Sequence, residues 1–557
     1  MAQLGDRIRA LFGRTRSPAP NKTVISTHSE RKVVVSSILV LLLIGLPLWW
    51  TTTRVYRATL PAADINKYAP TDTLHIPVHF YIDTDPVLLP SSAMAGIQKS
   101  AQALIAKSRK PYGNEEWRVQ YSAVVSRGMA PKDTPGHYTL RVERSDTVDH
   151  AVDVTADRSA VVTLAASPQP SARETEKQVA RVVAAIVSQE ERAVRGAQRA
   201  RQQQPSTASR GALRFAPHIS ATLTLLNESP VGGAQVDWEI EQAAALFLQP
   251  LVDALRPLTR ISVTSQVLHH AGPPPVTPIV RNGTTFLTLP MLSHFVNSPS
   301  WNLASVDPVA PMLNFVLYVP ALASQPVHIL GAATDAFSVP QWGGIAIANL
   351  SPHTAPGSKV VLAPDDLQQY MGMFVAQLRA LLGIRNNAPL ASSTSGASDV
   401  NEYLDGKSVR IQRATMTGVS GWELDALMRQ WSVQNRHTAI TTLQSLVRLV
   451  DSLQNMVVMD EIKTQVEQSL ASLAAIDASL GSSDHLAAFT SAATAAVLAE
   501  TAFFDPSMVS MLYFPDQHKY AIYFPFFLPV AIPVLSAIRR LFAHHRKSRT
   551  DPAKKND

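Results

Sequence analysis

Hydrophobic residues concentrate in two uncharged runs, one near each end of the chain. The first covers residues 33–50 and, continued to residue 53, holds 21 residues. At about 1.5 Å per residue, a helix of this length crosses the roughly 30 Å hydrocarbon core of a membrane. The first run lacks the polar stripe of a helix on a globular surface, and the second run, residues 521–538, is of similar reach. The pattern predicts two membrane-spanning helices, at 33–53 and 520–538.

The polar middle of the chain begins with short stretches that alternate in polarity or are rich in β-branched residues. We expect strands at 74–82, 117–125, 138–142 and 160–164. A long charged helix is predicted over 173–203, with a narrow apolar stripe formed by Val179, Val182, Val183 and Ile186. The stripe indicates a packing face.

Strands and helices alternate between residues 213 and 385. Strands are predicted at 219–226, 261–268, 286–289, 312–319 and 345–349, and helices at 236–255 and 365–382. Asp365 is placed to cap the last helix and Gly383 to end it. The alternation predicts an α/β fold.

From a loop at 386–399 to residue 504, the pattern is almost entirely helical. Ser420 and Glu423 have the spacing of a capping box, in which each side chain bonds to the other residue's backbone N–H. We expect a helical bundle. Its apolar stripes could dock on partner subunits, but closure of the bundle's own core is the favoured interpretation.

The basic residues lie outside the polar middle. Residues 1–32 and residues 539–557 each carry seven Lys or Arg and two Asp or Glu, whereas residues 58–519 have a net charge of −5. Because Lys and Arg beside a span are retained in the cytoplasm, we expect both termini to be cytoplasmic and the middle to be lumenal. A cleaved signal peptide is the alternative for the first run. It is disfavoured because 32 residues precede the run and no small-x-small site precedes Arg54.

Together these patterns predict a membrane protein with two transmembrane helices and a large lumenal α/β domain followed by a helical segment. The expected parts are basic tails at 1–32 and 539–557, spans at 33–53 and 520–538, a strand-rich part with a long helix at 54–212, an α/β part at 213–385 and a helical part at 386–519.

The composition removes several chemistries. Cysteine is absent from all 557 residues, which excludes disulfides, thiolate nucleophiles and Cys-ligated zinc. The HExxH, Walker A, GxGxxG and GxSxG patterns are missing too. His269 and His270 end a predicted strand, where neighbouring side chains point to opposite faces and cannot chelate one metal ion. The sequence therefore predicts no catalytic, cofactor-binding or metal-ligating residue, and no nucleic-acid partner.

Two kinds of short signal fit a protein of the secretory pathway. The N-glycosylation pattern occurs in the middle at Asn227, Asn282 and Asn349, and only Asn282 lacks a Pro directly after the hydroxyl residue. Near the end of the chain, Lys554 and Lys555 fit the dilysine address that retrieves membrane proteins to the endoplasmic reticulum. This address is read only from the cytoplasmic side.

The second predicted span carries prolines at every fourth position, Pro525, Pro529 and Pro533. Each removes one backbone hydrogen bond, and the spacing places the three close to one helical face. The freed carbonyls need other partners in hydrocarbon. We expect this face to pack against another protein's membrane helices, with a lone kinked anchor as the alternative.

Several segments along the chain carry a resemblance to a known family. They are GLPLWWTTTRVYRATLP (45–61), MLNFVLYVP (312–320), PQWGGIAIANL (340–350), MFVAQLRALLGI (373–384), GWELDALMRQWSVQN (421–435) and, above all, AFFDPSMVSMLYFPDQHKYAIYFPFFLPVAIP (502–533). On these residues the chain resembles the PIG-S family of subunits of the glycosylphosphatidylinositol (GPI) transamidase.

The resemblance implies a non-catalytic subunit of the endoplasmic-reticulum complex that transfers a GPI anchor to the ω-site carboxyl of proproteins. A separate Cys-protease-like subunit would supply the nucleophile, and the expected partners are the other subunits and membrane lipid, with GPI itself as a candidate. No cofactor is implied. Two alternatives remain: a stand-alone lumenal binding or tethering protein, and a lumenal enzyme without a recognisable motif.

Overall fold

A computed structural model provides the fold. It describes residues 28–53, 56–68, 73–109, 119–145, 151–165, 171–202, 213–228, 233–272, 276–296, 301, 303, 310–384, 409–411, 417–453, 456–509 and 516–550. The described residues belong to two compact units. The first lies within Met1–Thr59, Leu449–Asp460 and Asp505–Asp557, and the second within Leu60–Arg448 and Glu461–Phe504.

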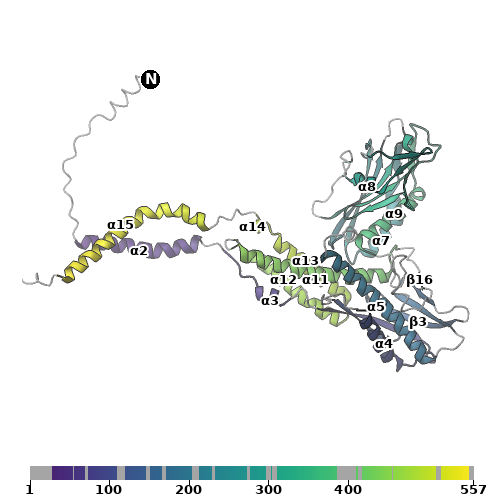
Figure 1. Ribbon diagram of the computed structural model, residues 1–557, viewed down its shortest axis with the longest axis horizontal. Helices are drawn as coiled ribbons and strands as arrows, with labels where there is room; N and C mark the ends of the chain where they lie inside the picture. Colours follow the sequence, from purple (N-terminus) through teal and green to yellow (C-terminus); the bar gives the residue numbers. More distant parts are fainter. Residues whose placement is uncertain are drawn as a thin grey trace, which may run out of the picture. The chain divides into compact units, whose positions relative to one another are not determined.

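The first unit contains the two apolar runs, and both are helical. Helix α2 (His28–Thr53) and helix α15 (Asp516–Thr550) contact each other (Figure 1). Many of their large apolar side chains are exposed, among them Leu43 at 74% and Leu535 at 65%. Contiguous exposed apolar surface of this kind marks a face that meets another protein or a membrane.

Among the described residues, one helix is both long enough and apolar enough to cross a membrane, and it is α13 (His485–Phe503) rather than α2 or α15. In α2, only the shorter stretch Ser36–Gly45 stands out as apolar. An Ala-rich face of α13 is fully buried within the second unit, and Ser469 Oγ donates a hydrogen bond to its Ala495 carbonyl at 2.8 Å. A core helix of a globular protein meets the same criterion, and the packing of α13 is of that kind.

The second unit contains a six-stranded sheet in the order β16-β4-β5-β3-β1-β2. Its strands are β1 (Leu74–Thr84), β2 (Val119–Arg127), β3 (His137–Ser145), β4 (Ala151–Val154), β5 (Ser159–Ala165) and β16 (Val409–Ile411), all parallel except for the β4–β5 pair. The four strands expected between 74 and 164 are confirmed. Helix α4 (Ala93–Ser108) was not predicted, because small residues dominate its sequence and weaken its apolar periodicity.

Helix α5 (Ala172–Gln202) confirms the expected long helix, but its buried surface is wider than the predicted stripe. Ala180, Ala184 and Ala185 are fully buried, as are Val179 and Val183. Alanine adds little to a hydrophobic pattern, yet it lets neighbouring elements approach closely. Helix α5 contacts α4 and β2 through one part of this surface.

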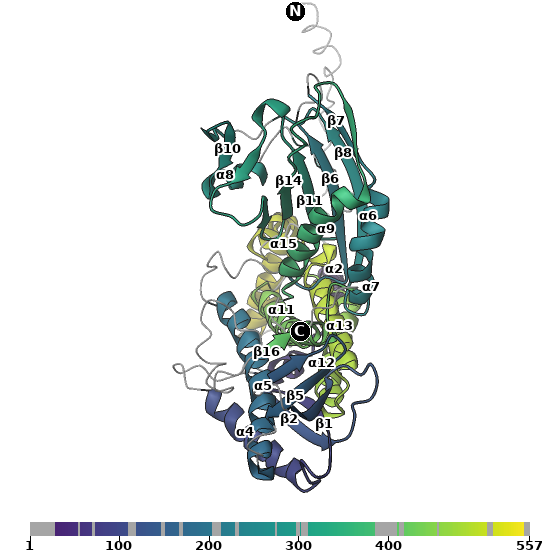
Figure 2. The same cartoon turned by 90° about the vertical axis from the view of Figure 1, so that its right-hand side faces the viewer.

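The second sheet of this unit has the order β13-β14-β11-β6-β8. Its strands are β6 (His218–Asn227), β8 (Arg260–His269), β11 (Met312–Val319), β13 (Ala336–Val339) and β14 (Gly343–Ile347), parallel except at the β13 edge. Helices α6 (Ile240–Phe247) and α9 (Pro364–Leu382) lie along it (Figure 2), and α7 (Gln249–Leu255) follows α6. Strand β11 is buried on both faces, as in doubly covered parallel sheets.

The opposite face of this sheet carries a separate apolar cluster built around Phe295, Trp301 and Tyr318. Short elements supply part of it: α8 (Leu289–Val296), β10 (Thr284–Leu287) and β12 (Val327–Ile329). The strands β10 and β12 form a small sheet with β9 (Ile279–Arg281). The 3₁₀ turn η1 (Leu322–Ser324) precedes β12, and its Leu322 packs against the other apolar cluster of this unit. The mixed α/β fold expected for 213–385 is thus confirmed.

Both predicted helices of that segment differ in detail from expectation. The helix predicted over 236–255 begins as a strand, β7 (Gln235–Trp238), which pairs with β15 (Lys359–Leu362), and the helical remainder is broken at Leu248, two residues before Pro250. The segment is a strand because it pairs with β15. The local pattern did not show this, because β15 lies far along the chain.

The N-terminus of α9 is the second difference. The helix begins at Pro364, and the Asp366 carboxylate, not that of Asp365, accepts a hydrogen bond from the Ala363 N–H at 3.1 Å. The predicted end at Gly383 is confirmed, with a left-handed φ of 82°.

The helices α11 (Gly421–Ser452), α12 (Asp460–Gly481) and α13 form the expected bundle. Ser469 of α12 bonds to the Ala495 carbonyl of α13, and the Trp431 ring of α11 stacks on Phe489 of α13 at 6.4 Å between centroids. The predicted capping box is present, since Ser420 N–H donates to Glu423 Oε2 at 2.9 Å and Glu423 N–H donates to Ser420 Oγ at 3.3 Å. Ahead of it, β16 interrupts the expected helical character, because it pairs with β4 of the first sheet. Short helices α3 (Ala62–Lys67) and α14 (Pro506–Val509) complete the described elements.

Candidate functional site

Helix α11 carries a line of buried charges toward the six-stranded sheet. Asp425, Arg429 and Arg436 recur at spacings of four and seven residues, which places them on one helical face. Their exposed fractions are 0%, 2% and 8%. Charged residues are almost never buried this deeply unless they are paired. The partners of each residue therefore show whether its role is structural or whether it is available to bind a ligand.

Asp425 is fully satisfied. Its two carboxylate oxygens accept hydrogen bonds from Arg158 Nε at 2.8 Å and Arg158 Nη2 at 2.7 Å, and the Gly136 N–H donates to Oδ2 at 2.9 Å. Arg158 lies in the β4–β5 turn and Gly136 directly precedes β3. This carboxylate therefore fastens α11 to two loops of the sheet.

Arg429 is paired as well. It donates to both carboxylate oxygens of Glu190 on α5, at 2.5 and 2.7 Å, and to the Tyr138 hydroxyl at 2.7 Å. The ring of Tyr138 stacks on Trp422 with a centroid separation of 3.9 Å. Burial by itself would lower the pKa of Arg429, but the opposing effects of Glu190, Tyr138 and Asp425 together outweigh it, and the net shift is upward. The arginine is therefore a permanent cation at the junction of α5, α11 and β3.

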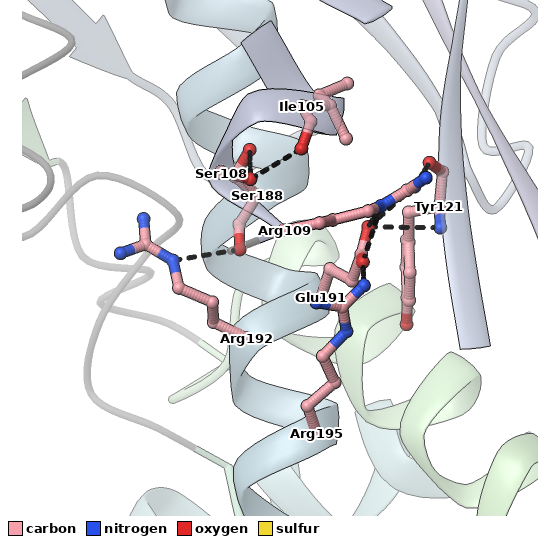
Figure 3. Close-up of polar contacts among 8 residues, drawn as sticks. All are labelled: Ile105, Ser108, Arg109, Tyr121, Ser188, Glu191, Arg192 and Arg195. Carbon is pink, nitrogen blue, oxygen red and sulfur yellow. Dashed lines mark hydrogen bonds and ion pairs between the residues drawn. The ribbon is translucent and has the colours of Figure 1, made fainter. Parts of the chain in front are cut away.

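Glu191, the next residue of α5, is the centre of a separate cluster of polar contacts (Figure 3). Arg109, just after α4, donates to Glu191 Oε1 at 2.9 Å and Oε2 at 3.0 Å, and also to the Tyr121 carbonyl at 2.7 Å. Tyr121 N–H donates to Glu191 Oε2 at 3.2 Å, and Arg195 forms a further ion pair with Glu191. This cluster is structural, because its groups bond to one another and to strand backbone.

Arg436 differs from the other two. It lines a pocket that encloses about 1030 Å³ between the first sheet and α12. The wall residues are Pro61, Asp64, Lys67, Tyr68, Thr73, His75, Pro77, Ser122, Arg436, Glu467, Leu470, Ala471, Asp477, Leu480 and Gly481. A pocket of this size that combines apolar side chains with polar and charged ones is a candidate binding site. Sequence reasoning missed it, because its residues come from five separate segments.

Histidines lie near the same junction. The rings of His79 and His137 stack at 4.7 Å between centroids, and His79 Nε2 lies 2.6 Å from Ser483 Oγ. His485 is 2% exposed, and burial together with the nearby positive charge of Arg429 lowers its pKa to about 3. Within the described residues, no group of three His, Cys, Asp or Glu side chains is placed to hold a metal ion.

The three asparagines of the glycosylation pattern occupy very different places. Asn227 is 2% exposed and its amide donates to the Ala234 carbonyl at 2.9 Å. Asn349 exchanges two hydrogen bonds with the backbone of Val327, at 2.8 and 2.9 Å. Asn282 is exposed in the β9–β10 hairpin turn, where it and the following glycine adopt φ values of 51° and 77°. Positive φ at both central positions is typical of a tight type I′ turn.

The other predicted site residues belong to the first unit or lie outside the description. Pro525, Pro529 and Pro533 are exposed on α15, which remains helical through all three. Lys554 and Lys555 lie outside the described residues. Near the end of α2, Tyr56 Oη donates to both carboxylate oxygens of Asp460 at 2.8 Å, within the first unit.

Comparison with known proteins gives a consistent result. Residues 36–548 match the family model described as phosphatidylinositol-glycan biosynthesis class S protein. The human "GPI-anchor transamidase component PIGS" is 31% identical, over 95% of this chain and 98% of its own length. The mouse protein of the same name is also 31% identical, over 92% of this chain and 95% of its own length. The Schizosaccharomyces pombe "GPI transamidase component PIG-S homolog" is 25% identical, over 90% of this chain and 81% of its own length. Because the family model covers nearly the whole sequence, the chain belongs to the PIG-S family.

Proposed function

We propose that this chain is a non-catalytic subunit of the GPI transamidase of the endoplasmic-reticulum membrane. The observation that carries the proposal is the end-to-end match to relatives that are named as components of that enzyme. A subunit with this role supports assembly and substrate handling while the GPI anchor is transferred to the ω-site carboxyl of a proprotein.

The nucleophile of the reaction belongs to another subunit in this proposal. A thioester-forming step needs a thiolate, and the chain has no cysteine in 557 residues. Its partners are therefore the Cys-protease-like catalytic subunit and the remaining subunits of the complex. The resemblance to the family supports this division of labour.

The proposed topology has two spans, α2 and α15, with both termini cytoplasmic and the second unit in the lumen. Its support is the exposed apolar surface of the two helices, together with the basic residues concentrated in 1–32 and 539–557. In this topology Lys554 and Lys555 stand on the side where a dilysine retrieval signal is read.

Contacts within the bilayer involve the proline face of α15. Pro525, Pro529 and Pro533 leave carbonyls of the preceding turn without their helical partner, and all three rings are exposed. We assign this face to the membrane helices of partner subunits, with membrane lipid around it.

Of the three glycosylation patterns, we assign the glycan to Asn282. An acceptor amide must be free and reachable, and Asn282 stands in an exposed turn, whereas Asn227 and Asn349 use their amides in hydrogen bonds to backbone. The exposed turn also tolerates a bulky attachment.

The test is complementation of cells that lack their own PIG-S relative. Expression of this chain should restore GPI-anchored proteins at the cell surface, measured by flow cytometry, and the tagged chain should co-purify with the other transamidase subunits in mild detergent. Purification without stoichiometric partners, together with no recovery of anchored proteins, would instead favour the stand-alone tethering protein. Protease-accessibility mapping that placed residues 58–519 in the cytosol would contradict the topology.

A further inference from the structure

The pocket beside Arg436 is the part of the second unit that the structural contacts leave unexplained. Helix α3, the start of β1, one residue of β2 and the C-terminal half of α12 surround it, and Arg436 of α11 completes the wall. Apolar side chains such as Leu470 and Leu480 form one part of the wall, and Thr73, His75 and Ser122 offer polar groups on another. Gln444 Nε2 donates to the Tyr68 carbonyl at 2.8 Å and ties this wall to α11.

Arg436 is the deepest charge of the pocket. It is 8% exposed, its Nε has no hydrogen-bond partner, and no residue that the structure describes forms a hydrogen bond or ion pair with its guanidinium. Arg429, two turns earlier on the same face, is buried to a similar degree but is held by the Glu190 carboxylate. A guanidinium presents five donors in a fork that matches carboxylate and phosphate oxygens. A buried guanidinium without a partner is therefore ready to receive an anionic group.

The rim of the pocket carries the opposite charge. Asp64, Glu467 and Asp477 line it and are exposed; Asp64 is paired with Lys67 at 2.6 Å and Glu467 with Lys463 at 3.8 Å. Asp477 has no such partner among the described residues. The Tyr68 phenol lies within electrostatic reach of both ends: burial raises its pKa most, the Asp477 charge raises it further, and Arg436 lowers it. The pocket thus has a cation inside and an unpaired anion at its mouth.

A simple anion could pair with Arg436, but the carboxylates at the rim would repel it and Asp477 would stay without a counter-charge. A zwitterion that enters with its anionic group first can pair with Arg436 and with Asp477 at the same time. We propose that the pocket binds a phosphoethanolamine group, with the phosphate against Arg436 and the ammonium toward Asp477.

The size of the pocket indicates what the group is attached to. A volume of about 1030 Å³ is several times that of a headgroup alone, and Thr73, His75 and Ser122 can bond to sugar hydroxyls. We therefore assign it to phosphoethanolamine carried on a sugar rather than on a diacylglycerol. This assignment rests on the proposed function, since a GPI anchor presents its reacting amine as ethanolamine.

Binding can be measured directly on the full chain purified in detergent, by titration calorimetry with soluble probes. The probes are phosphoethanolamine, inorganic phosphate, ethanolamine and a hexose 6-phosphoethanolamine. We expect the hexose-linked probe to bind most tightly, free phosphoethanolamine next, phosphate weakly and ethanolamine not at all. Short-chain phosphatidylethanolamine in the same detergent provides the lipid arm.

Two substitutions separate the two halves of the site. Arg436→Gln should weaken binding of phosphoethanolamine and of phosphate by at least about tenfold, since it removes a charge-assisted contact. Asp477→Asn should weaken only the probes that carry an ammonium group, by about threefold to tenfold. Arg448→Gln is the matched control, because Arg448 lies on the same helix but is exposed.

Loss of binding in Arg436→Gln can be distinguished from loss of folding. Arg436 has no described partner to leave behind, so Arg436→Gln should keep or raise the melting temperature of the ligand-free chain, and the probe should raise the melting temperature of the natural chain but not of the variant. Equal binding by Arg436→Gln and the natural chain, or no binding of any phosphate-bearing probe at millimolar concentration, would overturn the proposal. Tighter binding of phosphatidylethanolamine than of the hexose-linked probe would overturn the assignment to a sugar. Complementation that succeeds while binding fails would remove this inference and leave the proposed function intact.

Discussion

Glu190 on α5 holds Arg429 on α11 through two hydrogen bonds, although 239 residues separate them in the sequence. The pair connects α5, which packs on the first sheet, to α11, the first helix of the bundle. Both side chains are mostly buried, at 13% and 2% exposed. Removing one member of the pair and removing both should therefore change the stability of the fold by different amounts.

Removing one member should be far worse than removing both. Arg429→Met leaves the Glu190 carboxylate buried without a counter-charge, and we expect it to destabilise the second unit by about 3–5 kcal/mol. The double variant Arg429→Met with Glu190→Gln should recover a large part of this loss. Thermal and denaturant unfolding followed by tryptophan fluorescence would measure both. Lys463→Met, which breaks an exposed pair at 3.8 Å with Glu467, is the control and should change stability by less than about 0.5 kcal/mol.

Gly136 should be more sensitive to alanine than another glycine with the same backbone conformation. Gly136 and Gly357 have φ values of 78° and 77°, but a β-carbon at Gly136 would lie 2.2 Å from Cδ2 of His485, whereas nothing lies within 4 Å at Gly357. Gly357→Ala should cost about 1 kcal/mol from left-handed strain alone. Gly136→Ala should cost about 2 kcal/mol more, since the His485 ring must move out of its packed position. Equal losses in unfolding experiments would show that the ring moves freely.

The buried His485 makes the stability of the fold depend on pH. Its pKa in the folded chain is lowered to about 3, first by burial and then by the Arg429 charge, while the unfolded value is near 6.5. The unfolded chain therefore binds a proton that the folded chain refuses. The contribution of the neutral, buried His485 to the free energy of unfolding is fully present above pH 6.5. It falls as the pH drops, by about 1 kcal/mol between pH 6.5 and 5.5.

Replacement of this histidine isolates its contribution. The difference in unfolding free energy between pH 6.5 and 5.5 should shrink by about 1 kcal/mol in His485→Gln. The control His353→Gln should leave it unchanged, because His353 is exposed. An unchanged pH dependence in His485→Gln would contradict the assignment.

Glycosylation should depend on Asn282 alone. In cells, Asn282→Gln should abolish the mobility shift that glycosidase treatment produces on gels, whereas Asn227→Gln and Asn349→Gln should leave it in place. The latter two should lower expression, since each breaks hydrogen bonds to backbone at 2.9 Å. A glycan that persists in Asn282→Gln would place the acceptor elsewhere.

The proline face of α15 should matter for assembly rather than for the fold of the second unit. Replacing Pro525, Pro529 and Pro533 together by Leu should straighten the helix and reduce co-purification of the partner subunits. The unfolding of the second unit should remain unchanged. Pro47→Leu on α2 is the control for replacing a proline in the membrane. Undiminished co-purification after the triple replacement would count against a partner on this face.

Elements with a strong local pattern were predictable from the sequence. Strand β11 was expected at 312–319 and occupies those residues, since a run of apolar and β-branched residues suits a strand buried on both faces. The Ser420–Glu423 box depends only on residues three apart and was also found. Strand β7 was misread as helix because its pairing with β15 joins residues more than 120 positions apart.

The sequence by itself determined the two apolar ends, the excess of positive charge around them, the absence of cysteine and the family of the chain, because each of these is written in composition and local order. Only the tertiary structure decided which charges are paired. Arg429 and Arg436 have the same side chain on the same face of α11, and no local pattern separates them. Glu190 reaches one, and an open pocket faces the other. The burial and partners of a charge are set by residues distant in the chain, so the contrast emerges only when α5, α11 and α12 pack together.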